Sequence, residues 1–243
     1  MHGNPDWATG ELLGFDLETT GVDRFSDRPV SYALVTLVHG EVTDRRSGLV
    51  DPGIEVPAGA TAVHGITTER ARAEGRPLPD ALVYLADALE EAVGRGVPVV
   101  GMKLDYDLTM LDVQCRMVTG RGLIERGFAG PVLDALVLDR HVDRFRRGRR
   151  TLVDLCAYYG VTIDHAHDAA ADAQAAARVV LELCRRHPDL CEQDLSVLHR
   201  SQSGWHREWA ESYDQWRSER GMTPLDPREF QWPIPGDAVA HSS

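Results

Sequence analysis

The chain has 243 residues, 43% of them hydrophobic, and its 38 acidic residues outnumber its 26 basic ones for a net charge of −12. This length can bury one full core and leave a tail. No apolar run is long enough to span a membrane and no N-terminal signal pattern is present, so we expect neither membrane insertion nor secretion. The four cysteines lack Cys-x-x-Cys spacing, which favours reduced thiols and a cytoplasmic protein.

The first predicted strand, residues 11–17, is an apolar run that ends at two acidic residues. Asp16 and Glu18 would leave this strand on the same face, because alternate side chains do so. Close carboxylates raise each other's pKa unless cations neutralise them, and hard oxygen ligands favour magnesium or manganese. A solvated strand end entering a polar loop explains this pair equally well when it is taken alone.

Two strands and two helices are predicted next. The strands cover residues 30–38 and 41–50, and His39 and Gly40 join them as a hairpin. The helices cover residues 67–74 and 80–94, and Asp80 is the expected N-cap of the second one.

A further acidic position follows the predicted strand over residues 97–101. Apolar residues then recur at helical spacing, which predicts a helix over 106–119 with Asp107 on its first turn. Residues 131–138 are predicted to be a strand followed by a helix, and residues 151–159 another helix.

The alanine-rich segment over residues 168–187 predicts a strong helix. His167 stands at its entrance and Asp172 lies about one and a half turns further along, so both can face one pocket. His165 competes for this place. Two positions rotate a side chain by about 200°, however, so only one of the two histidines can face that pocket.

Three of these segments resemble the DEDDh-type 3′→5′ exonuclease family, which includes the proofreading epsilon subunit of bacterial replicative polymerases. The similar stretches are Asp16-Leu17-Glu18-Thr19-Thr20-Gly21, Tyr106-Asp107 and His167-Asp168-Ala169-Ala170-Ala171-Asp172. The resemblance covers residues 10–187 in the family's order and spacing. It implies an α/β fold, a ribonuclease H-like mixed five-stranded sheet flanked by helices, and the predicted element order agrees with that architecture.

The resemblance also implies a catalytic set: Asp16, Glu18, Asp107, His167 and Asp172. The four carboxylates would hold two divalent cations, Mg²⁺ or Mn²⁺, with Asp16 bridging both. Glu18 and Asp172 would complete the site of the ion that carries the attacking water, and Asp107 would bind the other ion. His167 would accept the proton of that water, a role that suits imidazole because its pKa lies near neutrality. The expected reaction releases nucleoside 5′-monophosphates from the 3′ end of single-stranded DNA.

One position departs from the family pattern. Family members usually carry Asn four residues before the acidic residue of the second motif, and this chain has Lys103 there. A lysine at this place could compete with a cation or reach a substrate phosphate.

Several other residues are candidate substrate contacts. By resemblance, Leu17, Thr19 and His64 would lie near the substrate, and Gly65 would permit a tight loop after His64. A dense basic segment also precedes residue 151: Arg140, Arg144, Arg146, Arg147, Arg149 and Arg150. We expect Arg146, Arg147, Arg149 and Arg150 to hold the substrate backbone, although a solvated loop is the simpler interpretation of the composition.

The composition changes beyond residue 190. Trp205, Trp209, Tyr213 and Trp216 recur at helical spacing, and we call this set the aromatic stripe. We expect it to bury itself against the domain or another subunit, and stacking on bases is the alternative. The sequence thus divides into an exonuclease domain over residues 1–190, a helical and Pro-rich C-terminal extension over 191–236, and a disordered end over 237–243.

Three functions remain open from the sequence. The first is an active exonuclease. The second is a weakened nuclease domain that binds 3′ ends or associates with a polymerase, for which Lys103 is the main support, and the third is a small-RNA exoribonuclease. Nucleic acid is the expected partner in each case: single-stranded DNA, 3′ ends or RNA. A DNA polymerase and a second copy of the chain, as a homodimer, are further candidates, and no membrane partner is expected.

Overall fold

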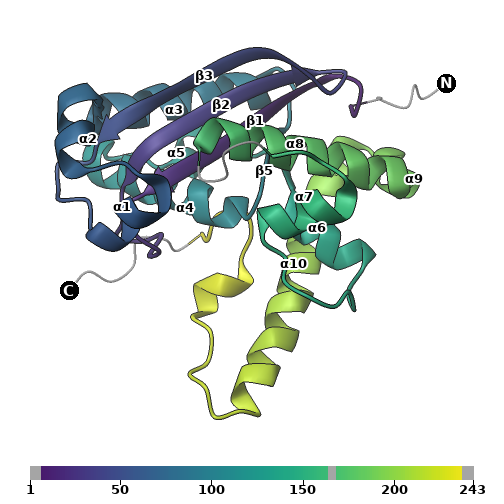
Figure 1. Cartoon of the computed structure of the whole chain (residues 1–243). Helices are drawn as coiled ribbons and strands as arrows, with labels where there is room; N and C mark the ends of the chain where they lie inside the picture. Colours follow the sequence, from purple (N-terminus) through teal and green to yellow (C-terminus); the bar gives the residue numbers. More distant parts are fainter. Residues whose placement is uncertain (1–6, 164–167, 237–243) are drawn as a thin grey trace.

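The computed structural model describes residues 7–163 and 168–236 as an α/β sandwich around a mixed six-stranded sheet (Figure 1). The strand order is β4-β3-β2-β1-β5-β6. The strands are β1 (Glu11–Thr19), β2 (Pro29–Val38), β3 (Glu41–Asp51), β4 (Arg76–Pro77), β5 (Val99–Gly101) and β6 (Val132–Asp134). The first three pair antiparallel, and β5 and β6 continue the sheet parallel to β1. The predicted ribonuclease H-like architecture is therefore confirmed.

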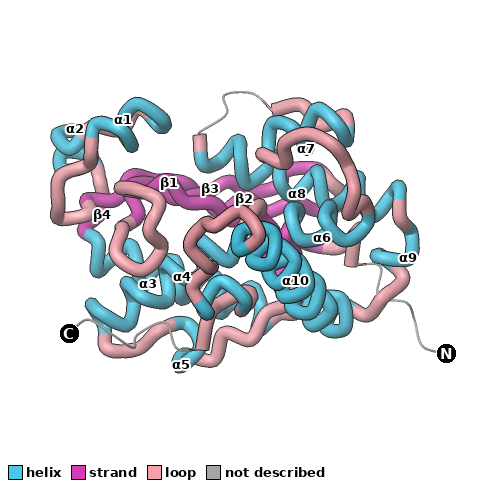
Figure 2. The backbone as a smooth tube through the Cα atoms, turned by 90° about the horizontal axis from the view of Figure 1, so that it is seen from below, coloured by secondary structure: helices cyan, strands magenta, loops and turns pink. Residues whose placement is uncertain are grey.

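Helices cover both faces of the sheet (Figure 2). They are α1 (Ala58–His64), α2 (Thr68–Glu74), α3 (Leu78–Gly94), α4 (Leu104–Thr119), α5 (Leu123–Arg126), α6 (Ala135–Val142), α7 (Leu152–Tyr159), α8 (Ala169–Arg186), α9 (Pro188–Cys191) and α10 (Leu195–Ser218). A short 3-10 helix, η1 (Pro227–Phe230), follows. No helix in the described ranges is both long and apolar enough to cross a membrane.

Alternate side chains of β1 belong to two separate hydrophobic cores. Leu13, Phe15 and Leu17 pack with α3 and α4 on one face of the sheet. Leu12 packs with α6, α7 and α8 on the other face. Strand β1 lies inside the sheet, and helices cover both of its faces. Its polar side chains can therefore lie only where these helices leave the strand uncovered.

Three local predictions need correction. The sheet has a sixth strand, β4, because two residues pair parallel to the end of β3. The helix expected to begin after Asp80 begins at Leu78 with Pro77 as its N-cap, since the first turn tolerates proline. The stretch around His64 is the end of a helix, α1, and Gly65 forms its left-handed cap with φ 73°. The hairpin at His39 and Gly40 has positive φ at both residues, as that turn requires.

The C-terminal extension packs into the domain at its base. Helix α10 then projects away from the sheet, and the following chain returns beside it (Figure 1). Gln202 on α10 accepts from the Asp134 amide and donates to the Val132 carbonyl, both at 2.8 Å. Trp232 and Ile234 lie in the same core as β1. Residues 237–243, predicted to be disordered, lie outside the described residues.

The aromatic stripe is only partly covered. Trp205 packs against both cores, as expected for a buried stripe. Further along α10 the cover ends, and the Trp216 side chain is 42% exposed. The domain therefore covers only the base of the stripe, and cover of its outer part by another subunit stays a prediction.

Candidate active site

Two acidic side chains project from β1 towards α8. Asp16 and Glu18 share a face with Gly14, and Phe15 and Leu17 occupy the opposite face. Helix α8 approaches this face unusually closely, because a Cβ at Gly14 would lie 2.8 Å from the carbonyl oxygen of Ala173. Only a glycine on the strand and small residues on the helix permit such packing. This close approach brings the first turn of α8 over the two carboxylates.

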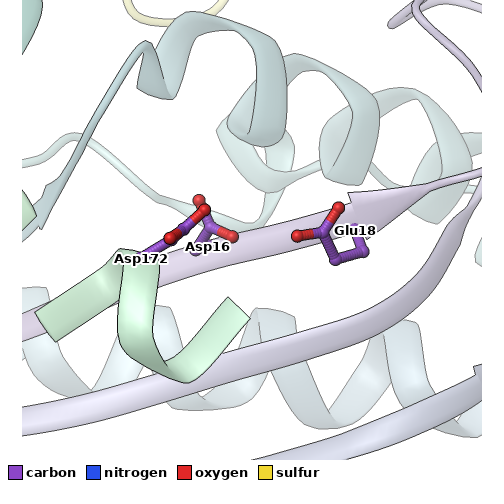
Figure 3. Close-up of side chains that lie close together, drawn as sticks. All are labelled: Asp16, Glu18 and Asp172. Atoms are coloured by element: carbon purple, nitrogen blue, oxygen red, sulfur yellow. The ribbon is translucent and has the colours of Figure 1, made fainter. Parts of the chain in front are cut away.

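Asp172 completes a cluster of three carboxylates. Carboxylate oxygens of Asp16, Glu18 and Asp172 all lie within 4.8 Å of one another, and they form the sole group of this kind found in residues 7–163 and 168–236. Figure 3 shows Asp172 reaching from α8 towards Asp16, with Glu18 further along β1. Predicted from segments far apart in the sequence, these three residues do converge.

Burial and mutual repulsion raise the pKa values of the carboxylates in the cluster. Burial is the main reason that the pKa of Asp16 is raised well above its ordinary value, followed by repulsion from Asp107 and Asp172. Burial, with repulsion from Asp172 and Asp168, raises the pKa of Glu18 to about 7. A nearby cation would favour the ionised form of each group. The cluster is thus built from residues that need positive charge beside them at neutral pH.

Asp107 faces this cluster from α4. It is buried on the first turn of that helix, as the sequence predicted, and its charge is the largest electrostatic influence on Asp16. Burial raises the pKa of Asp107 well above its ordinary range, and so does Asp105. Lys103 and a hydrogen bond from the Leu17 backbone lower it. Asp107 is therefore a fourth carboxylate that acts on the cluster.

The position of Asp107 depends on a buried carboxylate that the sequence analysis missed. Asp134 accepts from the Lys103 and Leu104 amides at 3.1 and 2.8 Å, and it also caps α6 by accepting from Leu136 at 2.8 Å. One side chain thus fixes the starts of two helices. The available signal was an acidic residue at a strand-to-helix junction, which suits an N-cap, but its contact with α4 is tertiary.

Lys103 is the only lysine in the sequence, and its backbone adopts the left-handed conformation with φ 62°. Its ammonium nitrogen lies 5.3 Å from the centre of the Tyr106 ring. Asparagine adopts this backbone conformation more readily than lysine does. The asparagine that the family usually carries therefore suits the backbone conformation of this position, apart from any contact with substrate.

Replacement of Lys103 by Asn is expected to keep or raise nuclease activity. The change relieves backbone strain, and it removes a charge that competes with cations for Asp107. Steady-state hydrolysis of labelled oligonucleotide over a manganese titration measures both effects. Lys103→Gln is the control, because it removes the charge and keeps the strain. A collapse of activity in both variants would show that the ammonium itself is needed.

The predicted contacts Leu17 and Thr19 have structural roles. The Leu17 side chain packs in the core, so it is not available as a wedge against a base, and only its backbone faces the site. The Thr19 hydroxyl donates to the Gly21 carbonyl at 2.7 Å, and the Tyr106 hydroxyl donates to the same carbonyl at 2.5 Å. These bonds hold the turn after β1 against α4. Burial raises the pKa of Tyr106 to about 12, so this hydroxyl keeps its proton.

His64 is placed near the carboxylates. A cavity of about 270 Å³ is lined by His64 from α1, Glu18 from β1 and Asp168 at the start of α8. The Nδ1 atom of His64 accepts from the Ile66 amide at 3.1 Å, which orients the ring. The predicted proximity of His64 to the substrate therefore stays open as a proposal.

The predicted arginine contacts divide into two groups. Arg146 pairs with Asp139 at 2.9 Å, Arg150 pairs with the same carboxylate, and the Tyr159 hydroxyl donates to it at 2.8 Å. The largely buried guanidinium groups of Arg146 and Arg150 fasten the segment between α6 and α7, and their contact with the substrate backbone stays a prediction. Arg147 and Arg149 are exposed, with Arg149 3.8 Å from Asp154. A sequence pattern could not separate these two groups, because Asp139 lies on a preceding helix.

His167, the predicted general base, and its competitor His165 lie outside the described residues. The adjacent Asp168 is the N-cap of α8, accepting from Ala170 and Ala171 at 3.1 and 3.0 Å. Its charge also raises the pKa of Glu18. Asp168 is therefore a residue of the site that the sequence analysis mentioned only as part of a motif.

Comparison with known proteins supplies a family context for this geometry. A family model described as Exonuclease matches residues 13–180. The DNA polymerase III subunit epsilon of Aquifex aeolicus is 26% identical over 179 residues, which are 72% of this chain and 80% of that protein. A DNA polymerase III PolC-type protein of Lacticaseibacillus paracasei is 28% identical over 70% of this chain, and the chain spans only 11% of that polymerase.

A solved structure shares the fold. Exonuclease I of E. coli in complex with a dT13 oligonucleotide superposes with a TM-score of 0.62 at 21% identity. The match covers 74% of this chain and 42% of exonuclease I. At that identity the likeness shows the fold, and the chemistry has to be argued from the residues of this chain.

Proposed function

The chain belongs to the exonuclease family that its residues 13–180 match, and from this premise we propose that it is a metal-dependent 3′→5′ exonuclease acting on single-stranded DNA. The observation that carries this proposal is the convergence of Asp16, Glu18 and Asp172, with Asp107 facing them from α4. Support for the substrate comes from the epsilon subunit among the relatives and from the oligonucleotide in the related exonuclease I structure.

The residues fit divalent cations of the hard class. Every donor in the cluster is a carboxylate oxygen, the ligand that magnesium and manganese prefer. The raised pKa values of Asp16 and Glu18 indicate groups that ionise favourably only beside positive charge. Two bound cations would stabilise negative charge on the attacking and leaving oxygens of a phosphodiester.

The side chains then have distinct tasks. Asp16 is central, since Asp107, Asp172 and Glu18 all act on its pKa, so we assign it to both cations. Glu18 and Asp172 would hold the cation on the water side, and Asp107 the other one. His167 would take the proton from the water, as the family resemblance implies.

Hydrolysis assays with end-labelled strands test this proposal. We expect single-stranded DNA labelled at its 5′ end to shorten stepwise with magnesium or manganese, and no shortening with a chelator. The same assay on RNA tests the exoribonuclease alternative. Tight binding of 3′ ends without cleavage in any metal would refute the enzyme and select the weakened, polymerase-associated module, the alternative that Lys103 beside Asp107 favours.

A further inference from the structure

A second hollow lies beside the carboxylate site. This α10 groove has a volume of about 890 Å³ and runs between the outer face of α10 and the segment from α6 to α7. Figure 2 shows α10 passing next to α6. Its lining includes Lys103, Arg140, Arg144, Phe145, Trp209 and Tyr213.

Stacked aromatic rings continue from the groove along α10. Trp209 and Tyr213 stack with ring centres 5.3 Å apart and planes 14° apart. Tyr213 and Trp216 stack in the same way at 5.7 Å and 15°. The side chain of Phe145, from the opposite wall, is 87% exposed. The stack runs from Arg140 over Trp209, through Tyr213 and Trp216, to Arg220, so these ring faces are already covered. Phe145 is the ring of this groove that offers exposed surface to a base of a single strand.

Positive charge lines the same groove in an otherwise acidic protein. Its lining contains four cations, Lys103, Arg140, Arg144 and Arg150, against two carboxylates, Glu208 and Glu229. Glu229 is paired with the buried Arg24 at 2.9 Å and Arg150 is paired with Asp139, which leaves three cations against one carboxylate. With a net charge of −12 over the whole chain, this local excess is a feature of the groove and not of the surface in general.

Arg140 is the clearest sign of an anionic ligand. Its guanidinium carbon lies 3.4 Å above the centre of the Trp209 ring. Burial lowers the pKa of Arg140 to about 10. Within the part of the chain that the structure describes, no carboxylate comes within 4.0 Å of this guanidinium, whereas Arg146 and Arg150 both have Asp139. A desolvated guanidinium without a paired carboxylate suits a phosphate, which it can bind through two parallel hydrogen bonds.

Lys103 connects the groove to the carboxylates. Its side chain lines the groove, and its charge lowers the pKa of Asp107. A strand whose 3′ end lies among Asp16, Glu18 and Asp172 can therefore pass Lys103 and enter the groove without crossing the sheet. Along α10, the distance from Trp205 to Trp216 is about 16 Å at 1.5 Å per residue, which is enough length for several nucleotides.

We propose that the α10 groove binds the single strand on the 5′ side of the nucleotide being removed, with a phosphate on Arg140, which the ring stack of α10 holds in place, and a base on Phe145. This inference rests on the proposed exonuclease function and adds a substrate class to it, single strands several nucleotides long. The same rings could serve only to stiffen α10, but that role requires neither the unpaired Arg140 nor the exposed Phe145.

Binding and hydrolysis measured separately test the groove. Fluorescence anisotropy in chelator, with thymidine and uridine strands of about 16 nucleotides, reports binding without turnover. The p-nitrophenyl ester of thymidine monophosphate, with metal, reports the carboxylate site alone. We expect Arg140→Gln, Tyr213→Ala and Phe145→Ala each to weaken strand binding on the order of tenfold. Arg207→Gln, an exposed arginine of α10 absent from the groove lining, is the matched control and should bind normally.

The outcomes separate this inference from the function beneath it. Strand affinity that stays the same in the three groove variants overturns the groove, whether or not the ester is hydrolysed. If the wild type hydrolyses neither the ester nor the strand, the exonuclease proposal is overturned. Strand affinity that falls in the groove variants and not in Arg207→Gln would still support the groove. As a direct readout, reductive methylation with a ¹³C label marks the single lysine, Lys103, and its NMR signal should shift when the strand binds.

Discussion

Replacement of Asp172 by Asn is expected to lower exonuclease turnover on the order of 10³-fold while leaving the metal-free protein as stable as before or more stable. Activity falls because one of three converging carboxylates loses its charge. Stability behaves oppositely, since Asp172 raises the pKa of both Asp16 and Glu18 by repulsion. Removal of that repulsion makes ionisation of the two remaining groups at neutral pH less unfavourable.

Turnover of labelled single strands and thermal unfolding with and without manganese measure the two halves of this result. In the wild type, manganese should raise the melting temperature, because a ligand that binds only the folded state stabilises it. That rise should be smaller in Asp172→Asn. Glu182→Gln is the matched control, being on the same helix and paired with Arg185 away from the cluster. A variant that loses both activity and metal-free stability would indicate that Asp172 has a structural role instead.

The parts of this site that could be predicted from the sequence are those encoded within one element. Asp16 and Glu18 share a face because alternate side chains of a strand lie on the same side. Asp172 lies one turn into a helix that the alanine-rich sequence strongly predicts. Their meeting in space depends on Gly14, whose missing side chain lets α8 lie directly on β1. Only the family resemblance pointed to that convergence, because strand and helix are far apart in the chain.

The residues that escaped prediction all act across elements. Asp134 caps its own helix, which a sequence can suggest, but it also holds the start of α4 from another strand. Arg146 and Arg150 resemble their neighbours in the basic segment and differ only in reaching Asp139. Arg24 forms a buried ion pair with Asp105 next to the site, and nothing local in either residue indicates it. Tertiary pairing of charges is invisible to spacing alone.

The same limit explains the C-terminal extension. Its helical stripe was predicted correctly, and burial of that stripe was expected against the domain or another subunit. The structure buries the base of α10 through Gln202, Leu198 and Ala210 and leaves the outer rings stacked on each other. The extension therefore has two regions with different roles. The base belongs to the core of the domain, and the outer part forms one wall of the α10 groove.

Deletion of residues 200–243 is accordingly expected to leave a protein that does not fold stably. The deletion removes Trp232 and Ile234 from the core, and loss of one buried tryptophan side chain costs about 3–5 kcal/mol. It also leaves the Asp134 amide and Val132 carbonyl without Gln202, at about 1–3 kcal/mol for each unsatisfied buried group. Total stability of a domain is about 5–15 kcal/mol, so these losses take most of it.

Urea unfolding followed by circular dichroism measures this effect, with deletion of residues 237–243 alone as the control that should unfold like the full chain. Gln202→Ala provides a milder version, expected to be folded but less stable by about 2 kcal/mol, because it removes the bonds to β6 and keeps the core tryptophan. A deletion of 200–243 that unfolds at the same urea concentration as the full chain would show that the core closes without α10. In that case the extension would be a separable attachment, and the carboxylate site would not depend on it.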